Sequence, residues 1–278
     1  MIHPVVCCRV RPLSLLEKGT VSCSPNGTSL AIESMGSFEM DYVFNADATQ
    51  DQVFARIVPP LLNDIMRGIN CTLFTYGQTG SGKTYTMQGG SPNPEDNSRG
   101  IIPRVVDAIF RYDSDHLGAT ANTSNGRHLR EFMFSMLEIY QEKLNDLLAN
   151  PIPPTSSKDN SPVALRIREL GDGTIFVQGL SEVAIKNSDD FHTLLQQGLK
   201  RRVTGGHKMN QESSRSHLCC MIFVRQLTAN GARINSKIHL IDLAGSELVP
   251  VQYCVSWLRI HLSYICLWLI IRCSISFY

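Results

Sequence analysis

The chain has 278 residues, of which 43% are hydrophobic, and its formal net charge is +1. This length and composition favour one substantial core in a single α/β domain over two domains. A charge so close to zero gives no overall indication of a nucleic-acid or membrane partner, so a charged partner would have to meet a local patch. We therefore expect no nucleic-acid partner and no membrane association.

The cysteines and the N-terminus indicate the compartment. The chain has nine cysteines, an odd number with no CxxC pair, and Cys7-Cys8 and Cys219-Cys220 are adjacent in expected strands. This usage is typical of buried thiols in a reducing compartment. A strand pattern begins by Pro4 without a basic and apolar leader before it. We expect a cytoplasmic protein.

In the first half of the chain, apolar spacing predicts strands and helices in turn. A helix beginning after Thr49 contains Pro59 and Pro60, which should kink or restart it, and Gly68 should end it. The expected elements are strands at 5–11, 38–44 and 71–76, helices from 49, from 83 and over 101–112, and a polar loop over 112–128.

The second half begins with an expected strand and ends with two more. Ser188 is expected to cap a helix that ends in the basic run 200–202, which we interpret as a solvated helix end, with a partner patch as the alternative. The expected elements are strands at 132–140, 164–168, 175–177, 218–227 and 234–243, a helical turn at 142–148 and a surface loop at 150–162.

The motif GxxxxGK followed by Ser or Thr is complete directly after the expected strand 71–76. In such a phosphate loop, backbone N–H groups surround a β-phosphate, Lys83 reaches the β and γ oxygens, and the Thr84 hydroxyl can ligate Mg²⁺. The helix that Lys83 begins adds its positive end to the same anion. A chance glycine-rich turn is the alternative, and the flanking strand and helix argue against it. The expected cofactor-binding residues are Gly77, Gln78, Thr79, Gly80, Ser81, Gly82, Lys83 and Thr84.

Two later segments, 210–217 and 242–247, have the character of phosphate sensors. Asp242 follows an expected buried strand and can hold the Mg²⁺ shell through water, while Gly245 can offer its N–H to the γ-phosphate and release it after hydrolysis. Each segment alone would pass as an ordinary polar turn. Their order after a phosphate loop favours two nucleotide switches.

Four segments together resemble the kinesin motor domain: GQTGSGKTYTM at 77–87, NQESSRSH at 210–217, DLAGSE at 242–247 and CRVRPL at 8–13. The resemblance spans residues 1–247 and implies a partial motor domain there. It implies the α/β fold of a phosphate-loop NTPase, with a mixed central β-sheet flanked by helices on both faces. It further implies that Arg9, Arg11 and Pro12, with Tyr85, form the nucleotide-base pocket.

The resemblance also implies roles in catalysis. Ser214 is expected to join Thr84 at Mg²⁺, and Ser213 and Ser214 to place the lytic water. Arg215 is expected to pair with Glu247 when the two switches close. The expected catalytic set is Ser213, Ser214, Arg215, Gly245 and Glu247, and the expected metal set is Thr84, Ser214 and, through water, Asp242.

The function implied by this resemblance is that of a microtubule motor head that binds and hydrolyses ATP with Mg²⁺, with tubulin as partner and the cytoskeleton as location. A small GTPase would also fit the second switch, but no (N/T)KxD guanine-reading segment occurs in the chain. Myosin continues its first switch as SSRFG, whereas this chain has SSRSH at 213–217.

The resemblance stops after Glu247. Residues 248–278 contain no Asp or Glu and hold both tryptophans and three of the nine cysteines. The longest uncharged run, Ile260 to Ile271, has 12 residues, fewer than the ~17–25 that span a bilayer. We interpret this tail as foreign, such as translated intron or a mispredicted gene end, over the alternatives of a native buried helix or a membrane anchor.

Kinesins continue past this point with microtubule-binding helices, a last core strand, a final helix and a neck linker, none of which is found. The resemblance places that last strand between the N-terminal strand and the phosphate-loop strand. We expect the tail to form an apolar helix or unsettled extension, leaving two strand edges open at a cost of roughly 1–3 kcal/mol per unpaired group. The alternative function is therefore a non-motile nucleotide-binding fragment.

Overall fold

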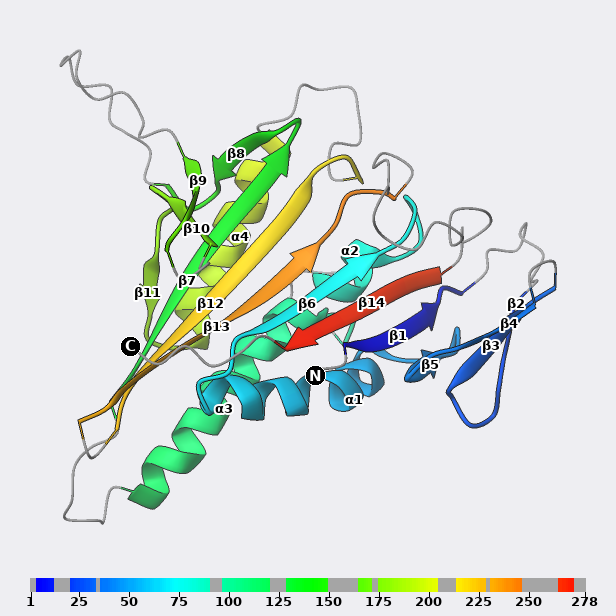
Figure 1. The fold of residues 1–278 in the computed structure, drawn as a ribbon, viewed down its shortest axis with the longest axis horizontal. Coiled ribbons are helices and arrows are strands. Elements are labelled where there is room, and N and C mark those ends of the chain that lie inside the picture. The colour runs from blue at the N-terminus through cyan, green and yellow to red at the C-terminus, as the bar shows by residue number, and fades with distance from the viewer. Residues whose placement is uncertain are drawn as a thin grey trace.

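The computed structural model describes residues 4–12, 21–33, 36–90, 97–120, 129–149, 165–171, 175–204, 214–228, 231–246 and 265–272. These residues form a mixed nine-stranded sheet in which only the pairs β13/β6 and β1/β5 are parallel (Figure 1). The strand order is β11 (Val183–Ile185), β7 (Leu129–Tyr140), β12 (His217–Leu227), β13 (Arg233–Asp242), β6 (Cys71–Tyr76), β14 (Ile265–Arg272), β1 (Val5–Val10) and β5 (Tyr42–Phe44), with β8 (Lys143–Asp146) paired to β7.

The central strands have a side-chain period of two, so alternate residues enter the helical side of the sheet. In β12, Leu218, Cys220, Ile222 and Val224 all belong to the main core cluster. The strand pairs with β7 along its whole length, from His217 opposite Ile139 to Leu227 opposite Leu129. This long register holds the first-switch end of β12 at a fixed place on the sheet.

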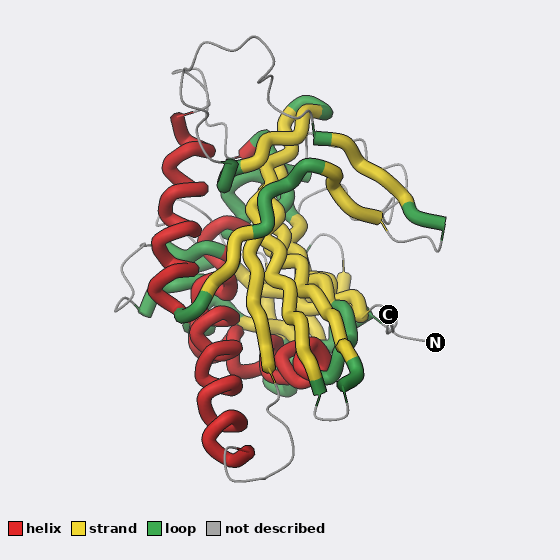
Figure 2. Tube along the Cα trace, turned by 90° about the vertical axis from the view of Figure 1, so that its left-hand side faces the viewer, coloured by secondary structure: helices red, strands yellow, loops and turns green. Residues whose placement is uncertain are grey.

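All four described helices lie on one side of the sheet (Figure 2). The long helix α3 (Ile101–Thr120) contacts the other three, which are α1 (Gln50–Met66), α2 (Lys83–Met87) and α4 (Ser188–Thr204). Their apolar faces meet the strands in one core. The described residues thus confirm the phosphate-loop α/β class with a mixed sheet, and they supply the helical layer on one face.

Helix α1 shows how local signals and packing combine. A reciprocal capping box at Thr49 and Gln52 begins it, as expected for an N-cap threonine. Pro59 and Pro60 lie inside one continuous helix, so the expected restart is wrong. Their rings lie on the exposed side. The carbonyls that lose a partner there can bond to water, while the opposite face stays packed in the core.

Two smaller sheets flank the main one. The first contains β2 (Val21–Cys23), β3 (Ser29–Ile32) and β4 (Gly36–Glu39), and the second contains β9 (Arg166–Glu169) and β10 (Ile175–Gln178). The expected strand over 38–44 is therefore two strands in different sheets. The change occurs at Met40 and Asp41, whose N–H groups donate to Thr28 O and Val6 O at 2.8 and 2.9 Å.

Three further expectations about secondary structure are wrong. The helical turn expected at 142–148 is strand β8, which follows a tight turn in which Gln141 and Glu142 have φ values of 48° and 62°. These residue types give no signal for a left-handed turn. The loop expected from residue 112 is helix as far as Thr120, and the cap of α4 is Asn187, whose Oδ1 accepts the Asp190 N–H at 2.8 Å.

The largest departure from the sequence-based expectation is β14. It lies between β1 and β6, antiparallel to both, with six paired positions on each side. The expected apolar helix or unsettled extension with an empty place in the sheet is therefore wrong for Ile265–Arg272. The segment is rich in isoleucine and leucine with one tryptophan, and β-branched and aromatic residues favour strands. Residues 247–264 and 273–278 lie outside the described residues.

Candidate nucleotide site

The phosphate loop leaves β6 at the carboxyl edge of the sheet and runs into α2. Because β13 is parallel to β6, with Asp242 opposite Thr75, the second switch begins at the same edge. Gly80 and Gly82 have φ values of 82° and 101°, a region that glycine enters without strain. The loop closes with the Ser81 N–H donating to Gln78 O at 3.2 Å.

Lys83 lies inside this loop, with 6% of its surface exposed. Its Nζ donates to the carbonyls of Gly77 and Gln78, both at 2.8 Å. The Ser81 hydroxyl is also buried, and it has no hydrogen-bond partner among the described residues. Both groups are hydrogen-bond donors held at the loop: the Lys83 ammonium is bonded to neutral carbonyls there, and the Ser81 hydroxyl lacks a partner among the described residues. They fit an anionic, oxygen-rich ligand such as a phosphate.

Asp242 is the acidic centre of the site and is 1% exposed. Its Oδ2 accepts from Thr84 Oγ1 at 2.7 Å and from Gln88 Nε2 at 3.0 Å. Burial raises the pKa of Asp242, although the Thr84 hydrogen bond and the positive charge of Arg202 oppose the rise. A buried carboxylate beside a hydroxyl is a donor set that Mg²⁺ accepts, so these residues fit the metal.

The two switches are joined by backbone hydrogen bonds. The Gly245 N–H donates to Ser214 O at 2.8 Å, and the Ser246 N–H donates to Gly77 O at 3.0 Å. The Ala244 N–H donates to His217 Nδ1 at 3.1 Å, which requires an unprotonated Nδ1. Burial and then the charge of Arg202 lower the pKa of His217 and favour that neutral form.

Some expected site residues are not brought together in the described part of the chain. Arg215 is described and exposed, whereas Ser213 and Glu247 lie outside the described residues. The expected Arg215–Glu247 pair therefore stays a prediction. Ser214, Gly245 and the phosphate loop do meet at one edge of the sheet, through the hydrogen bonds given above.

The residues expected at the base pocket are built around Arg9. Its guanidinium is buried and donates to Gln50 Oε1 at 2.8 Å, Thr86 Oγ1 at 3.0 Å and Ala48 O at 3.0 Å. It also lies 5.3 Å from the centre of the Tyr85 ring, which is 44% exposed. Arg9 thus packs against one face of the Tyr85 ring, and part of this ring is open to solvent. Arg11 is half-buried and Pro12 is exposed.

Gln50 is a residue that the sequence analysis missed. It is 3% exposed, and its Nε2 donates to Tyr85 O at 2.7 Å and to Ser98 O at 3.2 Å while its Oε1 accepts from Arg9. Gln50 therefore joins three distant segments beneath Tyr85. Its only signal in the sequence is its place at the start of an expected helix, which gives no hint of this role.

The basic run at the end of α4 is only in part the solvated helix end that the sequence analysis favoured, since Lys200 is exposed and Arg202 is buried. Arg201 Nη1 donates to Leu147 O at 2.9 Å and to Ala149 O at 2.6 Å. Arg202 is only 6% exposed, and its Nη2 donates to Ser216 O at 3.1 Å. The solvated interpretation is wrong for Arg202, because this guanidinium holds the end of the first-switch segment.

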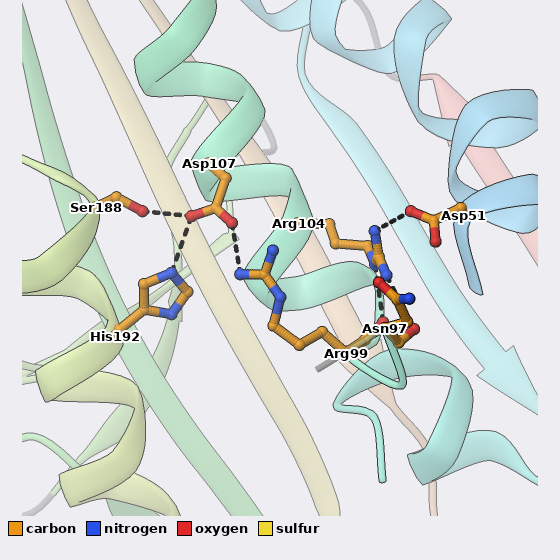
Figure 3. Close-up of polar contacts among 7 residues, drawn as sticks. All are labelled: Asp51, Asn97, Arg99, Arg104, Asp107, Ser188 and His192. Atoms are coloured by element: carbon orange, nitrogen blue, oxygen red, sulfur yellow. Dashed lines mark hydrogen bonds and ion pairs between the residues drawn. The ribbon is translucent and has the colours of Figure 1, made fainter. Parts of the chain in front are cut away.

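A second missed cluster fastens α4 to α3 (Figure 3). Asp107 on α3 accepts from Arg99 Nη1 at 2.7 Å, from His192 Nε2 at 2.8 Å and from the Ser188 hydroxyl. Burial alone would raise the pKa of Asp107, but these hydrogen bonds hold it well below its usual range. Gly100, which follows Arg99 in the chain, donates its N–H to Gln88 O at 3.1 Å. Gln88 caps the C-terminal end of α2, so the cluster is connected to the helix that follows the phosphate loop.

A phosphate loop on a buried strand, with an acidic switch on the adjacent parallel strand, defines a phosphate-loop nucleotide-binding protein. The chain belongs to the kinesin family, since the kinesin motor domain model matches residues 17–253. The resemblance drawn from its motifs is thereby confirmed. Among the described residues, no helix is long and apolar enough to cross a membrane.

Individual relatives agree with the family assignment. The chain is 38% identical to kinesin-related protein 3 of Dictyostelium discoideum and 40% identical to the kinesin heavy chain of Syncephalastrum racemosum, each over 88% of this chain but only 20% and 25% of the relative. The solved structure of a fast kinesin matches with a TM-score of 0.73 and 31% identity, over 88% of this chain and 66% of the other. The chain thus spans a quarter or less of these curated relatives.

Proposed function

We propose that this chain is part of an ATP-hydrolysing motor head that acts on microtubules in the cytoplasm, with Mg²⁺ as its metal. The observation that carries the proposal is the placement of Asp242, which is buried and bonded to Thr84 of the phosphate loop at 2.7 Å. The same switch reaches Gly77 and Ser214 through its backbone. A change at the phosphate loop can therefore be transmitted to the second switch and to its hydrogen bond with Ser214.

Hydrogen-bond exchange would make the site sensitive to the γ-phosphate. Lys83 Nζ, now on two carbonyls, would donate to the β and γ oxygens. The Gly245 N–H, now on Ser214 O, would donate to the γ-phosphate and return to Ser214 after hydrolysis. Each donor thus has a partner in both states, so the switches have two alternative arrangements of similar bonding.

We propose that residues at the same edge of the sheet hold the metal and the lytic water. Thr84 and Ser214 would ligate Mg²⁺ through their hydroxyls, and Asp242 would hold the metal through water. Bound Mg²⁺ would neutralise charge on the phosphates. Ser213 and Ser214 would place the lytic water, and Arg215 and Glu247 would pair when the switches close. These roles are carried over from the kinesin family to the matching positions of this chain.

The test is steady-state ATP hydrolysis by the 278-residue protein with and without microtubules. We expect Mg²⁺-dependent turnover that microtubules accelerate, that GTP supports less well and that Arg215→Ala or Glu247→Ala stops without preventing nucleotide binding. Because the pair acts as a unit, the double variant should be little worse than either single one. Absence of ATP hydrolysis by the folded protein would contradict the proposal.

One observation favours a second candidate, a nucleotide-binding protein that does not move along microtubules. The described helices cover only one face of the sheet, and the resemblance assigns the main microtubule contact to helices that follow the second switch. The assay of ATP hydrolysis with and without microtubules distinguishes the motor head from this second candidate. Turnover that microtubules do not change, together with failure to co-sediment with microtubules, would favour the second candidate.

A further inference from the structure

Ser216, in the first-switch motif, is completely buried between an acid and a base. Its hydroxyl donates to Glu138 Oε1 at 2.7 Å. Arg202 Nη2 donates to both the Ser216 hydroxyl and the Ser216 carbonyl at 3.1 Å, and its Nε lies 3.4 Å from Glu138 Oε1. Three elements, α4, β7 and the start of β12, therefore meet at a single serine.

Both charged members of this cluster are withdrawn from water. Arg202 is 6% exposed and Glu138 is 8% exposed, and Asn145 Nδ2 donates to the second oxygen of Glu138 at 3.3 Å. The low dielectric of such surroundings strengthens charge-assisted hydrogen bonds, and the shortest of those given above joins Ser216 to Glu138. Removing one partner would leave the other charge buried and uncompensated, so the cluster has a well-defined arrangement.

The opposite side of the same short segment is held by the second switch. Ser214 O accepts the Gly245 N–H and His217 Nδ1 accepts the Ala244 N–H, at 2.8 and 3.1 Å. Residues 214–217 are thus fixed on one side by a buried ion pair and on the other by the backbone that follows Asp242. We call residues 138, 202 and 216 the switch clamp.

We propose that Arg202 is a positioning residue: acting with Glu138 through Ser216, it fixes residues 214–217 so that the Ala244 and Gly245 amides have stationary acceptors. This proposal rests on the proposed function for its effect on turnover. It does not require Arg202 to touch nucleotide. The second switch would then move against a fixed strand end.

A purely structural ion pair would have different consequences. It would stabilise the packing of α4 on β7, and its loss would lower stability without a local effect at residues 244 and 245. The clamp instead predicts that these two amides become more accessible when Ser216 is released, although neither touches Arg202. Amide hydrogen exchange of the peptide that contains residues 243–246 distinguishes the two roles and requires no catalytic activity.

The test compares Arg202→Lys with Arg201→Lys, because these neighbours end the same helix and only Arg202 bonds Ser216. Arg202→Lys keeps the charge but loses the forked geometry. We expect amide exchange at 243–246 to rise on the order of tenfold in Arg202→Lys and to stay unchanged in Arg201→Lys. Ser216→Ala, which deletes one hydroxyl, should act like Arg202→Lys and serves if the latter folds poorly.

Turnover provides the second readout. In Arg202→Lys and Ser216→Ala, kcat for ATP should fall about tenfold while KM stays within about twofold, as expected when only alignment is lost. Unchanged amide exchange in Ser216→Ala, or an equal rise in Arg201→Lys, would overturn the clamp. If the wild-type protein hydrolyses no ATP but its exchange responds as described, the proposed function fails and the clamp stands.

Discussion

The phosphate end of the candidate site is made mainly by eight consecutive residues, 77–84, whereas the base end is assembled from distant parts of the chain. Arg9 bonds Gln50 and Thr86, which are 41 and 77 positions away in the sequence. At the phosphate end, the residues that contact Lys83 are five and six positions away. A contiguous loop can therefore be recognised from its letters, while the base end depends on how strands and helices pack.

Strand β14 lies between these two ends, because it pairs with β1, which carries Arg9, and with β6, which leads into the phosphate loop. The two ends thus share one support although they are built differently. Disturbing each part separately will show whether the ends depend on their own contacts or on the strand between them.

The largest effect is expected from breaking β14. Leu269 lies opposite Val6 on one side and Phe74 on the other. Leu269→Pro removes a donor from the middle of a central strand, so we expect a loss of at least about 3 kcal/mol in unfolding free energy and of nucleotide binding. Leu269→Val, which favours strands, is the control. Equal urea midpoints for the Pro and Val variants would show that the sheet does not rely on this strand.

Lys83→Ala tests the phosphate end alone. It removes the buried ammonium that would meet the β and γ oxygens, so hydrolysis should fall on the order of a hundredfold or more while the thermal midpoint changes little. The exposed Lys186→Ala is a matched control that should keep full turnover. Retention of more than about a tenth of the wild-type rate in Lys83→Ala would count against the assignment.

Gln50→Ala tests the base end. It leaves the buried Arg9 guanidinium short of one acceptor and frees the Tyr85 carbonyl, so we expect stability to fall by roughly 1–3 kcal/mol. Nucleotide affinity should weaken several-fold, with hydrolysis of the bound nucleotide largely kept. The exposed neighbour Gln52→Ala, which affects only the helix cap, should cost less. A loss of hydrolysis with unchanged affinity would mean that Gln50 serves the phosphate end instead.

The smallest effect concerns pH and the strands beneath the phosphate end. Burial, with a contribution from Lys237, lowers the pKa of His239 on β13 from its usual value to about 4. Between pH 6.5 and 4 the unfolded chain takes up this proton and the folded chain does not, so stability is lost as pH falls through that range. We expect a loss of about 2 kcal/mol between pH 7 and pH 5. His239→Gln should lack this component, and identical pH profiles would contradict the account.

Sequence reasoning succeeded where a local rule decides the structure. The helix expected after Thr49 begins at Gln50, the phosphate loop has its complete motif, and the strand expected at 218–227 is β12. It failed where tertiary partners decide. Arg202 resembles any basic helix end until Glu138 and Ser216 are brought beside it by β7 and β12.

The tail shows the same limit in a different way. Its composition led us to expect an apolar helix or an unsettled extension, and a short apolar run does not distinguish a helix from a fully buried strand. The place for a strand between β1 and β6 exists only in the folded sheet. The isoleucines and the tryptophan of the segment are compatible with a strand, and pairing on both sides determines the conformation of residues 265–272.

The most direct test of the account is an equilibrium titration of the 278-residue protein with a fluorescent ATP analogue, with Mg²⁺ and with EDTA. The Asp242–Thr84 arrangement predicts that Mg²⁺ tightens binding by at least about tenfold and that Asp242→Asn abolishes this dependence without unfolding the protein. Binding of equal strength with and without Mg²⁺, or no binding by the folded protein, would contradict the assignment of this edge of the sheet as a magnesium–nucleotide site.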